Sequence, residues 1–451
     1  MEKHNRSEQG QALILIVLGI VALLGFAALA IDGGRIYTDR QDMQNASDTS
    51  SLAGAAEYAN YFDANGILYS NWPATAADCE LESWFISATV DAKNAAISRA
   101  NNNGYVIDTT VDTSVPLPGG DYNGVKTWCG SDDYVGFKDN YIDIQTFITH
   151  DTPSSFAQFV FSGPLRQTTE SIARIYPQTS LAFGHAVVAL NDGACSGNQS
   201  GALFNGNNTI LINGGGVFSN GCFSVGGTSG SINVTNGSNN YVGSYVASGS
   251  FSVSPAPAQS TQSLPPSVTA IPAPDCSGLT NQGAWNGGGA LVEGQYDSIN
   301  IGANDVATMS AGLYCVSGDV TIGSQGELYG NLVTIYLTGD FNVNGNATVQ
   351  LDAPLAPASP EIPGVLIYNS QYDHSTSNQC VDLQGTSQSW YTGTIYAPDC
   401  QIDIGGSSGV QPTYSTQLIG WDVEFHGNVT LDINFQNNQA YQVPPRLNLQ
   451  K

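Results

Sequence analysis

The apolar run from Ala12 to Ile31 most constrains what this chain can become. It is twenty residues long and contains no charged residue. A helix rises 1.5 Å per residue, so this run matches a hydrocarbon core roughly 30 Å thick. A cleaved signal peptide is the weaker alternative, because Asp32-Gly33-Gly34-Arg35 leads into further Ala-rich, helix-compatible sequence. The run therefore predicts a membrane-spanning helix.

The pattern becomes amphipathic beyond Asp32. Apolar residues recur about every third or fourth position from Ile36 to Ala56, and charged residues fill positions between them. The simplest prediction is one long helix, half of it in lipid and half emerging from it.

Three motifs accompany this helix. They are Gly10-Gln11-Ala12, then Ala30-Ile31-Asp32-Gly33-Gly34-Arg35-Ile36-Tyr37, then Gln44-Asn45-Ala46-Ser47-Asp48 followed by Leu52-Ala53-Gly54-Ala55. Together they resemble the N-terminal segment of the TadG-like family of Tad (Flp) pilus assembly. The resemblance covers about the first sixty residues. It implies a membrane-anchored protein that works with Tad pilus components.

The resemblance also raises the question of processing after Gly10. Prepilin peptidases cut after a Gly that precedes the apolar run and usually require Glu at the fifth position beyond it. Here that position is Leu15. We therefore expect the chain to keep its N-terminus and to remain an anchored monomer or accessory subunit. A mature protein that starts at Gln11 would contradict this.

The charge distribution excludes one class of partner. Asp and Glu outnumber Lys and Arg 38 to 12, and the net charge is -26. From Ile175 to Pro445 there is no Lys or Arg, whereas seventeen Asp and Glu are present. A nucleic-acid site needs clustered cations, so nucleic acid is excluded as a partner. An acidic, solvated coat is the expected consequence.

Residues 59–178 predict an α+β module of pilin-like layout after the N-terminal helix of residues 1–58. Helical spacing runs from Leu81 to Ala100, and strand-like patterns cover residues 105–115, 141–149 and 168–176. A short aromatic helix is expected at residues 154–161. The order helix, strand, strand, short helix, strand is common in TadG-like chains.

From Leu181 onward, short β-rich runs alternate with Gly, Asn and Ser. Strand, polar Gly corner and strand recur over about 250 residues, and no helix-length periodic segment intervenes. The pattern favours an all-β, right-handed parallel β-helix. A β-sandwich is the alternative, because Asn220-Gly221 and Asn344-Gly345 are hairpin signals.

A Pro-rich connector, residues 254–275, divides this region into a first β portion, residues 179–253, and a second, residues 276–445. Residues 446–451 are expected to be a tail. The connector predicts a stiff, extended segment with no packing face. The sequence leaves open whether the two portions form one solenoid or two.

All eight cysteines follow the apolar run, and none forms a C-x-x-C pair. An even number in such a chain fits an oxidising compartment, with buried free thiols as the alternative. If one solenoid coil takes roughly 20 to 30 residues, cysteines one coil apart lie on adjacent rungs. The spacings of Cys195 to Cys222 and of Cys380 to Cys400 fit one coil each. Cys276 and Cys315 would need a longer coil or a loop, and a Cys79–Cys129 bond would tie the helical part of the pilin-like module to its strands. We predict these four sequential pairs.

Few residues offer chemistry. Asp373-His374 and the alternating Asp422, Glu424 and His426 are the candidates for a carbohydrate-active or metal site. A solvated strand face is the preferred interpretation, because the region has no Arg or Lys to bind an acidic sugar. His185 is expected to be structural. We predict no catalytic residue, no cofactor and no metal.

These observations predict a single-pass cell-membrane protein with the bulk of its chain outside the cytoplasm. The expected role is structural or adhesive, with surface glycans as a possible class of ligand and without catalysis. The competing hypothesis is a cell-envelope polysaccharide-modifying enzyme on the same β-helix. Turnover of glycans that is lost on replacing Asp422 or Glu424 would favour the enzyme.

Overall fold

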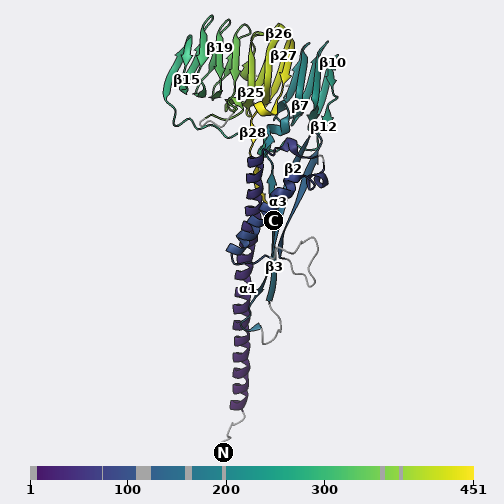
Figure 1. Cartoon of the computed structure of the whole chain (residues 1–451), viewed down its shortest axis with the longest axis vertical. Helices are drawn as coiled ribbons and strands as arrows, with labels where there is room; N and C mark the ends of the chain where they lie inside the picture. Colours follow the sequence, from purple (N-terminus) through teal and green to yellow (C-terminus); the bar gives the residue numbers. More distant parts are fainter. Residues whose placement is uncertain are drawn as a thin grey trace, which may run out of the picture. The chain divides into compact units, whose positions relative to one another are not determined.

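The computed structural model describes residues 8–73, 75–107, 123–157, 165–195, 200–355, 361–374 and 379–450. The chain divides into two compact units. Unit 1 comprises residues 1–131, 140–177 and 445–451, and unit 2 comprises residues 132–139 and 178–444. Figure 1 labels the elements of both units.

In the described residues, unit 1 contains a long helix, two shorter helices, a 3-10 turn and a four-stranded sheet. These elements are α1 (Glu8–Asn65), η1 (Tyr69–Asn71), α2 (Ala76–Cys79), α3 (Ser83–Asn102), β1 (Gly124–Tyr134), β2 (Phe137–Thr152), β3 (Leu165–Tyr176) and β29 (Arg446–Leu449). The sheet order is β1, β2, β3, β29, and β3 pairs antiparallel with both β2 and β29. The prediction of one long helix is confirmed by α1.

Small residues allow the helices of unit 1 to approach closely. Ala88, Ala92, Ala96 and Ala100 recur every fourth residue of α3, and all are fully buried. A Cβ on Gly54 of α1 would lie 2.9 Å from the carbonyl oxygen of Ala92. The Gly and Ala residues of both helices therefore set the distance between their backbones.

The structure changes several expectations for unit 1. The strand predicted at residues 105–115 lies mostly outside the described residues, and 105–107 are not in a strand. The helix predicted at 154–161 lies partly outside them as well. Strand β1 is absent from the prediction, because its polar residues hide the alternation. Residues 446–449, in the expected tail, form β29.

Unit 2 is dominated by a 23-stranded sheet, with β4 (Thr179–Ser180) and β28 (Gln442–Val443) as a separate antiparallel pair. Its first strands are β5 (Val187–Ala189), β6 (Ala202–Asn205), β7 (Thr209–Ser219), β8 (Cys222–Gly227), β9 (Ser231–Tyr241), β10 (Ser244–Gly249), β11 (Ser252–Ser254) and β12 (Ala258–Gln259). Next come β13 (Asn281–Asn286), β14 (Gly289–Leu291), β15 (Gly294–Ile301), β16 (Val306–Met309), β17 (Gly312–Val316), β18 (Val320–Ile322), β19 (Glu327–Asn331), β20 (Val333–Leu337) and β21 (Phe341–Val343). The last are β22 (Thr348–Asp352), β23 (Val365–Asn369), β24 (Gln379–Leu383), β25 (Trp390–Ala397), β26 (Gln401–Gly420) and β27 (Val423–Asn434). The described part of the unit also contains the short helical segments η3 (Leu181–Gly184), α4 (Pro266–Thr269) and η4 (Asn437–Gln439).

The pairings within this sheet are parallel, and many join residues about 21 positions apart in the chain. Ile299 pairs with Val320 and Val320 pairs with Phe341, which are steps of 21 residues. Parallel pairing distinguishes the sheet from the antiparallel β-sandwich. One row of paired residues that is at most 1% exposed runs through most of the stack: Ile299, Val320, Phe341, Val381, Ile402, Val423, Ala202 and Phe223.

That row also gives the order of the two β portions. The last strands of the second portion pair with the first strands of the first portion: β26 with β5, and β27 with β6 and β7. In Figure 1 the yellow strands β26 and β27 accordingly lie between green and teal strands. The two portions therefore form one continuous sheet, joined in an order that differs from their order in the chain.

The Pro-rich connector has a packing face, contrary to the prediction. Leu264, Val268 and Ile271 are buried, and Leu264 and Ile271 belong to a cluster that includes Tyr368 and Tyr396. The hydroxyl of Tyr368 also donates a hydrogen bond to the carbonyl oxygen of Ile271 at 3.2 Å. The connector is thus bound to the side of the sheet.

Candidate functional site

The predicted membrane segment lies entirely within α1, which contains both Ala12 and Ile31. Every large apolar side chain from Leu13 to Leu29 is more than half exposed. One helix in the described residues is long and apolar enough to cross a membrane, and none of its apolar window is buried. The exposed apolar surface fits a membrane anchor.

A polar contact follows immediately after this segment. Asp32 is 4% exposed, and its carboxylate accepts hydrogen bonds from the backbone N–H groups of Ser155, Phe156 and Ala157. The bond from Ser155 (2.8 Å) does most to hold the pKa of Asp32 below its usual value, against the opposing effect of burial. Arg35 donates to the hydroxyl of Ser155 at 2.8 Å. The Asp-Gly-Gly-Arg motif therefore binds the segment after β2 to the helix.

The cysteines form four disulfides, and none is free. The bonds join Cys79 to Cys129, Cys195 to Cys222, Cys276 to Cys315, and Cys380 to Cys400, with Cα–Cα distances of 6.2, 4.8, 6.2 and 6.0 Å. These are the four predicted pairs, of which Cys195–Cys222 and Cys380–Cys400 were expected from a spacing of one coil. Each bond stays within one unit and on one side of the connector.

The candidate residues Asp422, Glu424 and His426 do not form one group. Glu424 and His426 alternate with the fully buried Val423 and Phe425, so they face outward. Asp422 precedes the strand and is 2% exposed. Its carboxylate accepts hydrogen bonds from the Asn191 side chain at 2.9 Å and from the Gly201 backbone. Asp422 therefore joins two loops of the body.

Glu424 belongs to a row of three carboxylates, and the sequence did not single out the other two, Asp382 and Asp403. Asp382 of β24 pairs with Asp403 of β26, and Asp403 pairs with Glu424 of β27. Neighbouring parallel strands lie about 4.8 Å apart, so the three side chains form a closely spaced outward row, which we call the carboxylate row. Its signal in sequence is an Asp or Glu recurring at intervals of 21 residues.

The carboxylate row has perturbed acidity. Burial, reinforced by the charge of Asp403, raises the pKa of Asp382 to about 6. His426 lies 2.9 Å from Asp403 through Nδ1, and this hydrogen bond raises the pKa of His426. Glu424 accepts hydrogen bonds from Gln401 (2.9 Å) and Asn205 (3.0 Å).

The remaining histidine candidates have structural surroundings. His374 stacks on Trp421 with ring centroids 3.8 Å apart, and its Nε2 lies 3.4 Å from Asp399; neighbouring Asp373 donates its backbone N–H to the carbonyl of Asp399. His185 is buried against the carbonyl oxygen of Gly136 at 2.8 Å, and burial lowers its pKa to about 4. Within the described ranges, no group of three His, Cys, Asp or Glu side chains could hold a metal ion.

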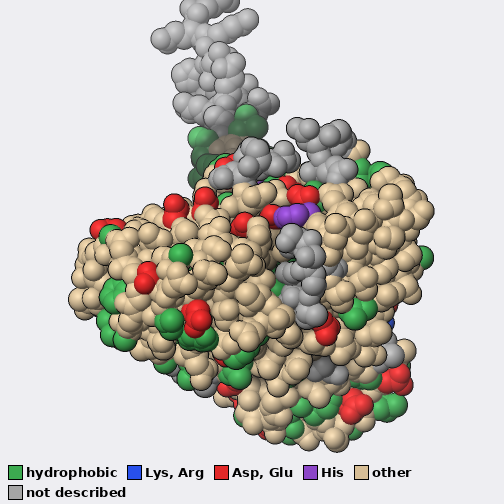
Figure 2. Space-filling view, turned by 90° about the horizontal axis from the view of Figure 1, so that it is seen from above, with side chains coloured by type: hydrophobic (Ala, Val, Ile, Leu, Met, Phe, Trp, Pro, Cys, Tyr) green, Lys and Arg blue, Asp and Glu red, His purple; other side chains and the backbone are tan. Residues whose placement is uncertain are grey.

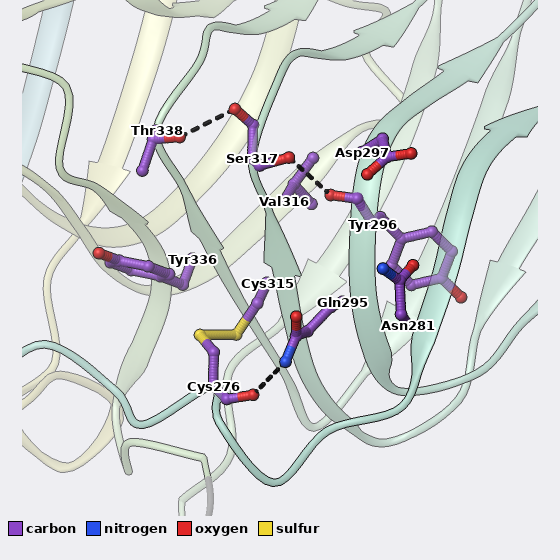
Figure 3. Close-up of a pocket in the computed structure, with 10 residues that line it drawn as sticks. All are labelled: Cys276, Asn281, Gln295, Tyr296, Asp297, Cys315, Val316, Ser317, Tyr336 and Thr338. Carbon is purple, nitrogen blue, oxygen red and sulfur yellow. Dashed lines mark hydrogen bonds between the residues drawn. A yellow bond between two sulfur atoms is a disulfide. The ribbon is translucent and has the colours of Figure 1, made fainter.

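A pocket of about 210 Å³ lies on the outer face of β13, β15, β17 and β20 (Figure 3). Residues at equivalent positions of these strands pair in sequence: Asn281 with Gln295, Gln295 with Cys315, and Cys315 with Tyr336. Ser317 and Thr338, which follow the ends of β17 and β20, also line the pocket. The pocket is lined by Cys276, Asn281, Gln295, Tyr296, Asp297, Cys315, Val316, Ser317, Tyr336 and Thr338.

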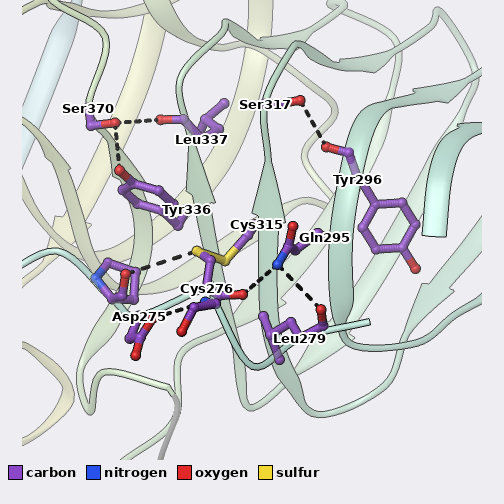
Figure 4. The surroundings of a disulfide bond; sticks show 12 residues. Asp275, Cys276, Leu279, Gln295, Tyr296, Cys315, Ser317, Tyr336, Leu337 and Ser370 are labelled. Atoms are coloured by element: carbon purple, nitrogen blue, oxygen red, sulfur yellow. Dashed lines mark hydrogen bonds between the residues drawn. A yellow bond between two sulfur atoms is a disulfide. The ribbon is translucent and has the colours of Figure 1, made fainter. Parts of the chain in front are cut away.

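One disulfide forms part of the pocket wall. Cys276, at the end of the connector, is bonded to Cys315 of β17 (Figure 4). The side-chain amide of Gln295 donates to the carbonyl oxygens of Cys276 (2.6 Å) and Leu279 (3.3 Å). The disulfide and Gln295 thereby hold the segment after the connector against the sheet.

The surface around these features is acidic and polar. Figure 2 shows acidic side chains scattered over one face, with histidine beside some of them. No Lys or Arg occurs between Ile175 and Pro445, a stretch that makes up nearly all of unit 2. Anionic ligands would meet only like charge here.

Two family models match parts of the chain. Residues 10–57 match the family described as Flp pilus-assembly TadE/G-like, and residues 298–438 match a domain family of unknown function (DUF7305). No curated protein and no solved structure matches the chain. The N-terminal match coincides with the exposed apolar part of α1 and with the Asp32 contact. Together they suggest a membrane-anchored, pilus-associated protein.

Proposed function

We propose that this chain is a single-pass membrane protein whose body lies outside the cytoplasm and serves in Tad pilus assembly or surface attachment, without catalysis. The observation that carries the proposal is the match of residues 10–57 to the TadE/G-like family on an exposed apolar helix. Four disulfides support an oxidising compartment for both units.

We infer further that the large sheet is a right-handed parallel β-helix and that unit 1 is a pilin-like module. Parallel pairing at steps of 21 residues around a continuous buried row supports the β-helix. A long helix packed on a small antiparallel sheet supports the module. Such a body would offer a broad polar surface for attachment.

Membrane anchoring is tested by extraction. The full chain should remain in the membrane fraction after an alkaline carbonate wash, because the apolar segment is buried in lipid. The double variant Leu18→Lys, Leu23→Lys should move to the soluble fraction, since each charge costs about 2.5–3.5 kcal/mol near the bilayer centre. The matched control is Leu81→Lys, Val90→Lys, which adds the same charge at exposed sites of unit 1. Release of the unmodified chain would contradict the anchor.

Location and partners need separate measurements. In acid-quenched cells the eight cysteines should resist alkylation until a reductant is added, and free thiols would contradict an oxidising location. In cells with a Tad system, cross-linking should recover Tad pilus components with the full chain. The variant Leu18→Lys, Leu23→Lys should not recover them. Equal recovery with that variant would refute an association that depends on the membrane helix.

The competing function is a polysaccharide-modifying enzyme, and the carboxylate row is the observation that favours it. Asp382 with a pKa of about 6 beside Asp403 resembles an acid and base pair. Turnover of a glycan panel that is lost in Asp382→Asn and in Glu424→Gln would support the enzyme. Asp422 is a poor probe for this purpose, because its replacement would also disturb Asn191 and Gly201.

A further inference from the structure

We propose that the pocket on β13, β15, β17 and β20 binds a neutral, hydroxyl-rich saccharide. The inference rests on the proposed attachment role and names a ligand class for it. Its basis is the combination in one hollow of free polar groups, the Tyr336 ring and no Lys or Arg.

The free polar groups are a carboxylate and an amide. The side chain of Asp297 makes no hydrogen bond or ion pair with any described residue. Asn281 uses its side-chain oxygen to accept from the Gly283 backbone at 2.8 Å, and its Nδ2 has no partner in the described part of the chain. A carboxylate accepts and an amide nitrogen donates, so the two together suit a sugar with vicinal hydroxyl groups, each both donor and acceptor.

The hydroxyl groups of Thr338 and Tyr336, which also line the pocket, are held in place by hydrogen bonds within the protein. Thr338 donates its hydroxyl to the Ser317 carbonyl at 2.9 Å, and Ser370 donates to the Tyr336 hydroxyl at 3.1 Å (Figures 3 and 4). The Thr338 oxygen can still accept a hydrogen bond, and the Tyr336 hydroxyl can still donate one. The half-buried Tyr336 ring gives an apolar face against which a sugar ring can pack.

The arrangement favours a chain of sugars over a single one. The paired row from Asn281 to Tyr336 crosses four adjacent strands, which separates its ends by about 14 Å at roughly 4.8 Å per strand. Figure 3 shows Tyr336 and Thr338 on one side of the disulfide and Asn281 and Asp297 on the other. An oligosaccharide can contact both sides at once.

Charge decides against acidic glycans. Asp297 lies in the pocket, and unit 2 contains a single Lys or Arg, Lys138, in its separate segment 132–139. A uronic acid would bring a second carboxylate to Asp297 without a counter-charge. This charge disfavours an anionic occupant.

The test uses the full chain in a zwitterionic detergent that carries no sugar. Neutral tetrasaccharides (cellotetraose, maltotetraose, mannotetraose and chitotetraose) are compared with tetragalacturonate by saturation-transfer NMR and calorimetry. At least one neutral probe should bind, and tetragalacturonate should not. Asp297→Asn and Tyr336→Ala should each weaken binding about tenfold, the effect of one lost polar or stacking contact.

Two controls make the result specific. Asp432→Asn removes the same charge from an exposed position of β27, outside the pocket, and should leave binding unchanged. Tyr336→Phe keeps the ring and should lose less than Tyr336→Ala. Failure of every neutral probe, equal binding of tetragalacturonate, or undiminished binding in both pocket variants would overturn the proposal. The carbonate extraction would be unaffected by any of these outcomes, so the two proposals fail separately.

Discussion

Asp32 shows how one side chain can fix a segment about 120 residues away. Its carboxylate is buried and accepts three backbone N–H groups, which is the arrangement that most favours the ionised form. Asp32 and Arg35 belong to the motif on which the family resemblance rests. The structure thus gives that motif a physical role at the end of the apolar segment.

We predict that Asp32→Asn loosens this segment. The amide has one acceptor oxygen and no charge, so hydrogen exchange at the N–H groups of Ser155, Phe156 and Ala157 should rise about tenfold. Asp42→Asn, at an exposed position of α1, should leave exchange unchanged. Unaltered exchange in Asp32→Asn would show that the contact adds no stability.

The pH dependence has a defined direction. The pKa of Asp32 is lower in the folded chain than its usual value of 3.8. Its stabilising contribution is therefore present above 3.8 and is lost as the pH falls through the lowered pKa. After correction for intrinsic rates, protection of Ser155 to Ala157 should be constant at neutral and mildly acidic pH and should decline only below 3.8.

Asp382 should produce the opposite dependence. Its pKa of about 6 lies above the unfolded value, so its contribution to the free energy of unfolding is present below 3.8 and is lost as the pH rises through 6. His426, whose raised pKa depends on Asp403, acts in the same direction above 6.5. Asp382→Asn should flatten the fall in melting temperature of unit 2 between about pH 4 and 7. Asp432→Asn should keep the slope, and an unchanged slope in Asp382→Asn would be the contrary result.

At the scale of elements, β29 ties the end of the chain to unit 1. Its residues pair antiparallel with β3, from Arg446 opposite Tyr176 to Leu449 opposite Ala173. The Arg446 guanidinium also lies 4.3 Å from the centre of the Tyr176 ring. A segment whose sequence indicates a tail is therefore part of a sheet, because its strand partner is distant in the chain.

We predict that removing residues 446–451 destabilises unit 1 by a few kcal/mol, at about 1 kcal/mol per hydrogen bond lost. Exchange at the backbone of residues 173–176 should increase. Leu447→Thr keeps the strand backbone and changes an exposed side chain, so it should behave as the unmodified protein does. A truncated chain of full stability would mean that β29 contributes nothing.

At the scale of the whole molecule, the connector is the only covalent link between the two β portions, and strand pairing joins them as well. Strands β26 and β27 pair with β5, β6 and β7, and no disulfide crosses the connector. Apolar pairs such as Val423 with Ala202 and Phe425 with Phe204 continue the core across this junction. The junction resembles any other step in the stack.

This predicts that a chain cut in the connector stays assembled. A protease site inserted between the exposed residues Pro272 and Ala273 should yield two fragments that elute together under native conditions. They should separate in denaturant without reductant. Because β28 and β29 also pair with β4 and β3 of the other fragment, the substitutions Phe425→Asp and Val423→Asp should let the cut fragments separate natively in a chain that lacks residues 442–451. Fragments of the unsubstituted protein that part after cleavage would contradict the pairing.

Local features of the sequence were sufficient for much of this molecule. An uninterrupted apolar run and a small-residue spacing specify α1 and α3, because helices satisfy their hydrogen bonds locally. Alternating apolar residues specify most strands of unit 2. The regular recurrence of those strands also predicts two of the four disulfides, Cys195–Cys222 and Cys380–Cys400, since cysteines about one repeat apart come to lie in neighbouring parts of the sheet.

Only the tertiary structure decided which strands meet. The joining of β27 to β6, the pairing of β29 with β3, the carboxylate row and the pocket all depend on register between segments far apart in the chain. Alternation identifies a strand and its buried face, but it does not identify the neighbour, because many apolar strands present equivalent edges. The partner is selected by the packing of the whole stack and by chain connectivity, and for this reason the candidate sites appeared only in the folded protein.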